Sequence, residues 1–188
     1  MPPSAPTGQR AAASFSLGEE GNTTVDIVIQ PAYQQLEAVK ALLLEYTSML
    51  LEQNPAAAGS CLQRQNFEGE LANLAEKYGA PQGRLYLIRV DGAPAGCAAM
   101  KRLDRYRCEL KRLYIRPPFR GQGLARRLVE RLLTDAREEG YEAMLLDTFP
   151  FLSQAIRLYR ALGFYEIPRY NSFGRSLIYM QKIGRAHV

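Results

Sequence analysis

The chain has 188 residues, 47% hydrophobic and 23% charged, a composition typical of one folded domain with a continuous core. A net charge of +5 favours anionic ligands such as nucleotides, but no basic stretch stands out, so a nucleic-acid partner is not indicated. The three cysteines lack the spacing of a zinc site or a disulfide framework, which predicts free thiols, a cytoplasmic protein and no metal centre. No apolar run approaches the roughly 20 residues of a membrane span.

Both ends of the chain differ in composition from the middle. Residues 1–23 are rich in proline, alanine, serine and glycine, so we expect a disordered tail there. Residues 183–188 spell Ile-Gly-Arg-Ala-His-Val, the peptide that a common sequencing-adapter read encodes, and we expect them to be non-native. The folded domain is therefore predicted over residues 24–182.

The first half of this domain predicts a strand, helices and then a run of strands. Val25 to Ile29 alternates apolar and polar residues, and a helical stripe then runs from Leu36 to Leu50. The stretch Asn54–Gly59 is expected to break that helix. A weaker helix is predicted over 63–78, and three strands over 84–90, 95–101 and 107–115, the first two joined by the hairpin turn Asp91-Gly92.

The second half shows clearer periodicity. An amphipathic helix is predicted over 121–139, a buried strand over 143–146, a helix over 152–162, and two strands over 164–167 and 177–181. Together these elements predict an α/β domain whose mixed sheet has about six to seven strands and about four flanking helices. A right-handed βαβ unit is expected between Glu109 and Asp147.

The turn Arg120-Gly121-Gln122-Gly123-Leu124-Ala125 connects a strand to the strongest amphipathic helix. Its glycines allow backbone N–H groups to close on an anion, and the helix dipole favours a pyrophosphate there. A plain strand-to-helix connector is the alternative. A P-loop does not fit because no Lys-Ser/Thr pair follows, and Arg126 occupies the third small position of a dinucleotide fingerprint, although Asp147 resembles its ribose-binding acid.

The same turn resembles the coenzyme A motif of the GNAT superfamily, R/Q-x-x-G-x-G/A. Leu113-Tyr114-Ile115 before it and Ala155–Phe164 after it are similar to that superfamily's fourth strand and late helix, so the resemblance covers about residues 108–164. It implies a GNAT acetyltransferase domain with acetyl-CoA as co-substrate. The residues it implies for cofactor binding are Leu113, Tyr114 and Ile115 for the pantetheine arm and thioester, and Arg120, Gly121, Gln122, Gly123, Leu124, Ala125 and Arg126 for the pyrophosphate.

The resemblance also implies two catalytic residues. An alkylammonium must lose a proton before it attacks a thioester, and Glu109, two residues before Lys111, is the expected base. An ion-paired strand glutamate without a catalytic part is the alternative. Tyr159, in the pattern Ala155–Phe164, is the expected acid for the leaving thiolate, because a phenol with a pKa of about 10 keeps its proton at neutral pH and can give it to the thiolate as it leaves. Its alternative is a buried core tyrosine.

Acceptor contacts are less determined. Asp147 ends a buried strand, where it is expected either to hold the acceptor amine or to cap the turn Thr148–Pro150. Glu68 and Glu70, in the region 67–81, would suit a cationic acceptor or would simply be solvated. Cys97 and Cys108 are expected to be buried, which gives a cysteine nucleophile little support.

The predicted function is direct transfer of the acetyl group from acetyl-CoA to a primary amine, with a small-molecule acceptor favoured over a protein. One alternative is a catalytically silent acyl-CoA-binding or sensing module. Another is an acylating toxin that acts on aminoacyl-tRNA, which would bind RNA in a salt-sensitive way. A homodimer stays an open alternative.

Overall fold

The computed structural model describes residues 24–184, so the tails expected at 1–23 and 185–188 lie outside the described residues. Within them a seven-stranded sheet has the order β1-β2-β3-β4-β5-β7-β6, in which only β4 and β5 are parallel. The predicted mixed α/β sheet is thus confirmed. Its strands are β1 (Ile27–Pro31), β2 (Arg84–Val90), β3 (Ala93–Arg102), β4 (Arg107–Ile115), β5 (Ala143–Thr148), β6 (Tyr165–Glu166) and β7 (Ile178–Ile183).

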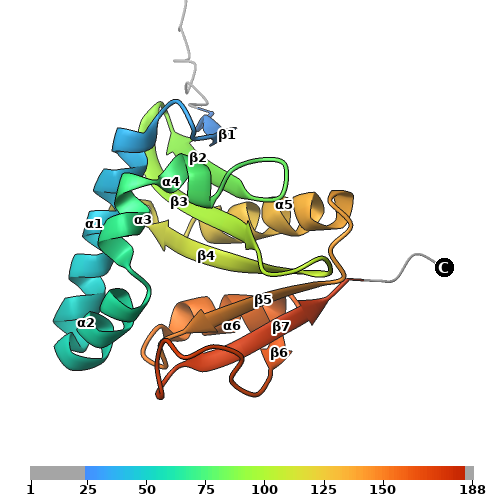
Figure 1. The fold of residues 1–188 in the computed structure, drawn as a ribbon. Coiled ribbons are helices and arrows are strands. Elements are labelled where there is room, and N and C mark those ends of the chain that lie inside the picture. Colours follow the sequence, from blue (N-terminus) through green and yellow to red (C-terminus); the bar gives the residue numbers. More distant parts are fainter. Residues whose placement is uncertain (1–23, 185–188) are drawn as a thin grey trace, which may run out of the picture.

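Helices cover both faces of this sheet (Figure 1). Helix α1 packs against β3 and β4 on one face, and α5 packs against β2, β3 and β4 on the other, where α6 shares its core cluster. The helices are α1 (Leu36–Gln53), α2 (Pro55–Arg64), α3 (Phe67–Ala72), α4 (Leu74–Lys77), α5 (Leu124–Glu138) and α6 (Ser153–Ala161), with a 3₁₀ turn at Pro117–Phe119.

The helical region after α1 differs from the prediction. The expected break at 54–59 is instead the start of α2, because the Asn54 side chain accepts a hydrogen bond from the Ala57 amide at 3.1 Å and Pro55 suits the first helical position. The single helix expected over 63–78 is divided into the end of α2, α3 and α4. Asn66, at φ 51°, caps α3 and stops the preceding helix from continuing, so six α-helices replace the expected four.

Strand periodicity predicted β2 and β4 with the bounds that they have in the structure. The hairpin turn is also as expected, since Asp91 and Gly92 both have positive φ, at 48° and 80°. At the other end β7 runs two residues past the strand predicted over 177–181, and its last residue, Ile183, pairs with Ala143. The sequence therefore located β2 and β4 better than the short helices.

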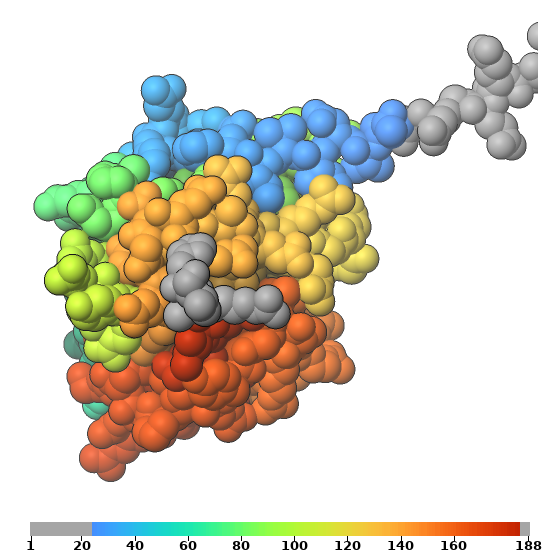
Figure 2. Space-filling model, turned by 90° about the vertical axis from the view of Figure 1, so that its right-hand side faces the viewer, coloured from blue at the N-terminus to red at the C-terminus, as the bar shows by residue number. Residues whose placement is uncertain are grey.

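The sheet splits between β4 and β5. Their parallel pairing stops at Glu109 and Leu145, although β4 continues to Ile115 and β5 to Thr148, so the two strands diverge (Figure 1). The side view shows β1 and α1 (blue) in the upper part of the molecule and the C-terminal elements (orange to red) in the lower part (Figure 2). In the part of the chain from 24 to 184, no helix combines the length and apolarity needed to cross a membrane.

Candidate active site

The turn before α5 has the geometry of an anion-binding loop. Gly121 and Gly123 have φ values of 78° and 74°, and a Cβ atom at either position would meet no neighbour within 4 Å. Their backbone conformation, rather than lack of space, therefore requires glycine. Gly123 caps α5 without a side-chain hydrogen bond, and the first backbone bond of the helix runs from Arg127 to Gly123 at 3.1 Å. The backbone amides of residues 124–126, which precede Arg127 in the first turn of α5, have no acceptor within the helix and can therefore bind an anion.

A cavity of about 330 Å³ lies beside this turn, and we call it the cofactor cavity. Of the residues expected to bind the cofactor, only Gln122 is absent from its lining. The Arg120 guanidinium donates from Nε to the Ile115 carbonyl at 2.9 Å, which holds it at the cavity wall. The expected residues that line it are Leu113, Tyr114, Ile115, Arg120, Gly121, Gly123, Leu124, Ala125 and Arg126.

Strand β4 carries a bulge where it reaches this cavity. From Lys111 to Tyr114 it advances three residues while β3 advances two, and Arg112 has a φ of 58°. Gly96 on β3 allows the two strands to approach here, because a Cβ atom on it would lie 2.4 Å from the Tyr114 carbonyl oxygen. The bulge and the left-handed Arg112 interrupt the regular pleat of β4 beside this cavity.

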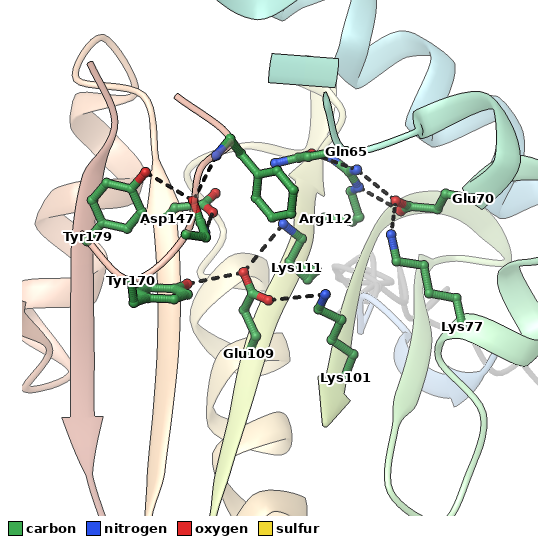
Figure 3. A network of polar contacts seen from close by, with 12 residues as sticks. Gln65, Glu70, Lys77, Lys101, Glu109, Lys111, Arg112, Asp147, Tyr170 and Tyr179 are labelled. Carbon is green, nitrogen blue, oxygen red and sulfur yellow. Dashed lines mark hydrogen bonds and ion pairs between the residues drawn. The ribbon is translucent and has the colours of Figure 1, made fainter. Parts of the chain in front are cut away.

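A buried ion pair ties this bulge to α3 (Figure 3). Arg112 donates from Nε and Nη2 to the two carboxylate oxygens of Glu70, at 2.7 and 2.8 Å. Tyr78 and Lys77 also donate to Glu70, both at 2.6 Å. Burial would raise the pKa of Glu70, but the Arg112 and Lys77 partners outweigh it and lower that pKa to about 2. The sequence had suggested that Glu70 is either solvated or in contact with an acceptor. The structure contradicts both expectations, because its carboxylate is buried and occupied by these partners.

A second, smaller cavity of about 50 Å³ lies in the split between β4 and β5, and we call it the acceptor cavity. It shares Tyr46, Leu113 and Ala155 with the cofactor cavity, so the two spaces meet at these side chains. Its further lining comes from five elements and from the segments after α2, β5 and β6. The lining includes Leu50, Cys61, Gln65, Leu110, Lys111, Arg112, Asp147, Thr148, Phe149, Leu152, Tyr159 and Leu177.

Tyr159 lies on α6 at the wall of the acceptor cavity, with its ring 5.7 Å from that of Phe164. Burial, together with the nearby Tyr46 and Asp147, raises the pKa of Tyr159 above its usual value. Burial also raises the pKa of Tyr46 to about 12. Both phenols therefore stay protonated at neutral pH. Tyr159 is thus buried, as its core alternative expected, and its role as the acid stays a prediction.

Glu109 is almost fully buried on β4, at 1% exposure, and is absent from the lining of both cavities. Tyr170 donates to its Oε1 at 3.1 Å, and the ammonium groups of Lys111 and Lys101 each lie 3.5 Å from its carboxylate. These contacts match the ion-paired alternative. The predicted role of Glu109 as the base stays a prediction.

Asp147 lines the acceptor cavity at the end of β5, half-buried. Its Oδ2 accepts a hydrogen bond from Asn171 at 2.8 Å, a contact outside the turn that it was expected to cap. Asn171 belongs to the segment 168–176, which also places Tyr170 on Glu109 and the Phe173 ring 5.7 Å from the Lys111 ammonium. Sequence reasoning missed this segment because it shows no periodicity. Tyr46 was predicted only as a helix-face residue.

The cysteines are buried, as expected. Burial raises the pKa of Cys97 and of Cys108 to about 12 and also raises that of Cys61. A thiolate nucleophile is therefore disfavoured at neutral pH.

A mixed sheet that splits beside an anion-binding turn, with a phenol and a carboxylate facing the split, is the architecture of an acyl-transferring enzyme. The chain belongs to the acetyltransferase (GNAT) family, whose sequence profile matches residues 50–164. An uncharacterized N-acetyltransferase of Schizosaccharomyces pombe is 35% identical over 158 residues, which cover 82% of this chain and 97% of the relative. The predicted family and enzyme class are thereby confirmed.

Solved structures agree on the fold. An acetyltransferase from Streptococcus agalactiae superimposes with a TM-score of 0.68 at 22% identity, covering 84% of this chain and 98% of that one. YncA from Salmonella typhimurium, solved with acetyl-CoA as its cofactor, superimposes with a TM-score of 0.61 at 22% identity, covering 87% of this chain and 96% of that one.

Proposed function

We propose that this protein transfers the acetyl group of acetyl-CoA directly to a primary amine on a small molecule. The observation that carries the proposal is the meeting of two cavities at Tyr46, Leu113 and Ala155. Direct transfer needs donor and acceptor to be held side by side, because orientation supplies much of the rate. The acceptor cavity, at about 50 Å³, favours a small acceptor over a protein.

The described residues fit the coenzyme. Left-handed glycines at 121 and 123, open amides at the start of α5, and Arg126 at the cavity wall suit a pyrophosphate. Leu113 and Ile115 suit the pantetheine arm, since β4 has no strand partner on its β5 side beyond Glu109. When bound, acetyl-CoA supplies a thioester whose C–S bond is exchanged for a C–N bond to the amine. YncA, with acetyl-CoA in its structure, supports this choice.

The proton transfers fall to side chains of the acceptor cavity. Tyr159 gives its hydroxyl proton to the departing thiolate; its raised pKa keeps the phenol protonated at neutral pH until that step, and the phenolate it leaves is then reprotonated. The β4 amides that lack a partner on β5 donate to the oxygen that becomes negative during attack. A base removes one proton from the ammonium before attack. After attack the nitrogen loses a second proton, which passes through solvent to the Tyr159 phenolate, and the base releases its own proton to solvent.

Two carboxylates are candidates for that base. Glu109 was expected from the sequence, but its carboxylate is held by Tyr170, Lys101 and Lys111 outside the cavity lining. Asp147 lines the cavity with one oxygen bonded to Asn171. We therefore propose that Asp147 takes the proton from the ammonium, directly or through water. Glu109 then influences the reaction only by positioning Lys111.

A substrate screen tests this function. Purified protein is given acetyl-CoA and a panel of polyamines, amino acids, amino sugars and peptide N-termini, and free thiol and acetylated product are measured. We expect turnover of at least one small amine. Coenzyme binding without turnover of any amine would instead establish the silent binding module, and would overturn the proposal.

The base is tested by comparing Asp147→Asn with Glu109→Gln on the best amine. We expect Asp147→Asn to lower kcat about 100-fold or more, with a smaller loss in Glu109→Gln. The reverse order would return the base role to Glu109. Unfolding temperatures of both variants separate lost chemistry from lost structure.

A further inference from the structure

We propose that the acceptor is an amino acid or a close analogue, with a carboxylate next to its primary amine, and that Lys111 binds this carboxylate. The inference rests on the proposed function and specifies its substrate class. It is carried by one buried lysine that faces the acceptor cavity opposite an aspartate.

Lys111 is an unusual group for such a small space. Its side chain is 5% exposed, and it lines the acceptor cavity from strand β4. Its nearest carboxylate oxygen, Glu109 Oε1, lies at 3.5 Å, longer than a well-formed hydrogen bond of about 2.7–3.2 Å. The face of Phe173 lies 5.7 Å away. The ammonium is thus attracted by Glu109 but retains capacity for a closer anion.

The charges around the cavity compensate Lys111 only in part. Glu109 is shared between two lysines, since Lys101 lies 3.5 Å from its other oxygen. The two lysines approach the carboxylate of Glu109 from different directions (Figure 3). Arg112, the other cation in the lining, is neutralised by its bidentate contact with Glu70. The cavity therefore presents one surplus positive group and one carboxylate, Asp147.

A zwitterion is the ligand that complements this pair. Its ammonium would lie on Asp147 and its carboxylate on Lys111, so that neither buried charge is left without a partner. A simple amine would leave Lys111 with only the Glu109 carboxylate that it shares with Lys101, and a polyamine would add a like charge beside it. The volume agrees, since about 50 Å³ holds roughly four water molecules, or the few atoms of an amine, an α-carbon and a carboxylate.

The test compares substrates that differ only in the carboxylate. Each amino acid of a panel is assayed beside its amide and its decarboxylated amine, and kcat/KM for thiol release is measured with the unmodified protein. We expect the carboxylate member of a reactive set to be preferred about 10- to 100-fold, the effect of one hydrogen bond to a charged group.

Two lysine variants assign the effect. Lys111→Met is expected to reduce that preference to near unity, mainly by raising KM for the amino acid. Lys101→Met is the matched control, because Lys101 lies at the same 3.5 Å from Glu109 but does not line the cavity, and it should keep the preference. If Lys111→Met does not fold, Lys111→Gln replaces it, and the substrate comparison on the unmodified protein decides independently.

The outcomes separate this inference from the proposed function. Equal turnover of amino acids, amides and simple amines would overturn the carboxylate requirement while the acetyltransferase activity stands. An equal loss of preference in Lys101→Met would overturn the role of Lys111 and assign the effect to Glu109. Absence of transfer to every amine would overturn the proposed function itself.

Discussion

The two cavities that meet beside β4 are built in different ways. The predicted part of the cofactor cavity comes from one continuous segment, residues 113–126, and the groups offered to its ligand are largely backbone amides. The acceptor cavity collects side chains from α1, α2, β4, β5 and α6. A local backbone motif is therefore expected to accept one constant ligand, whereas a site assembled from distant side chains sets which amine is used.

This contrast predicts that mutations in the two cavities change different kinetic constants. The largest change is expected for Tyr159→Phe, which removes the acid and should lower kcat about 10²- to 10⁴-fold. Its KM for acetyl-CoA should hardly change, because Tyr159 does not line the cofactor cavity. Steady-state kinetics with varied acetyl-CoA measures both, and an unchanged kcat would remove the acid role.

The link between the β4 bulge and α3 is the Arg112–Glu70 pair. Glu70→Ala leaves the buried Arg112 guanidinium without its carboxylate, at a cost of about 3–5 kcal/mol of unfolding free energy. For a chain of this size the melting temperature should fall by roughly 6–20 °C. Glu68→Ala, at an exposed position of the same helix, should stay within about 0.5 kcal/mol. Equal melting temperatures for the two variants would contradict the importance of the pair.

Acid should weaken the same link. The pKa of Glu70 is about 2 in the folded protein against 4.5 for a free glutamate, so its stabilisation is present above pH 4.5 and is lost as pH falls toward 2. The linkage amounts to about 3 kcal/mol across this window. Urea unfolding measured from pH 6 to pH 3 should show this loss of unfolding free energy in the unmodified protein. The control variant Glu138→Gln should show the same loss. Glu70→Gln should lack this part of the slope.

The smallest effect is expected at the turn. Gly123→Ala forces a Cβ atom into a left-handed conformation, at about 1–2 kcal/mol, so affinity for acetyl-CoA should fall about 5- to 30-fold with kcat retained at saturation. Gly92→Ala carries a similar strain in the β2–β3 hairpin, away from both cavities, and should change stability but not affinity. Calorimetric titration with coenzyme A distinguishes them.

Much of this fold is readable from local patterns. The Asp91-Gly92 turn marked the end of β2, and the glycines before α5 marked the cofactor turn, because a left-handed backbone leaves its signature in the residues of the turn itself. The Asn54-Pro55 pair also carried a signal, a helix cap followed by the favoured first residue, although the prediction treated it as a break.

The acceptor side was beyond local reading. Glu70 and Arg112 are 42 residues apart, and Tyr170 reaches Glu109 across 61. No periodicity predicts which distant polar groups meet when a sheet splits. Whether Glu109 was ion-paired, and whether Asp147 faced a ligand or capped a turn, depended on contacts of this kind.

The sheet order has a consequence for synthesis. Strand β7 lies between β5 and β6 although the ribosome makes it after both. While the nascent chain grows, β1 to β5 and the coenzyme turn can assemble, but β6 has no neighbour to pair with until β7 arrives. The polypeptide can thus complete the part that carries the coenzyme turn before β7 arrives to join β5 and β6.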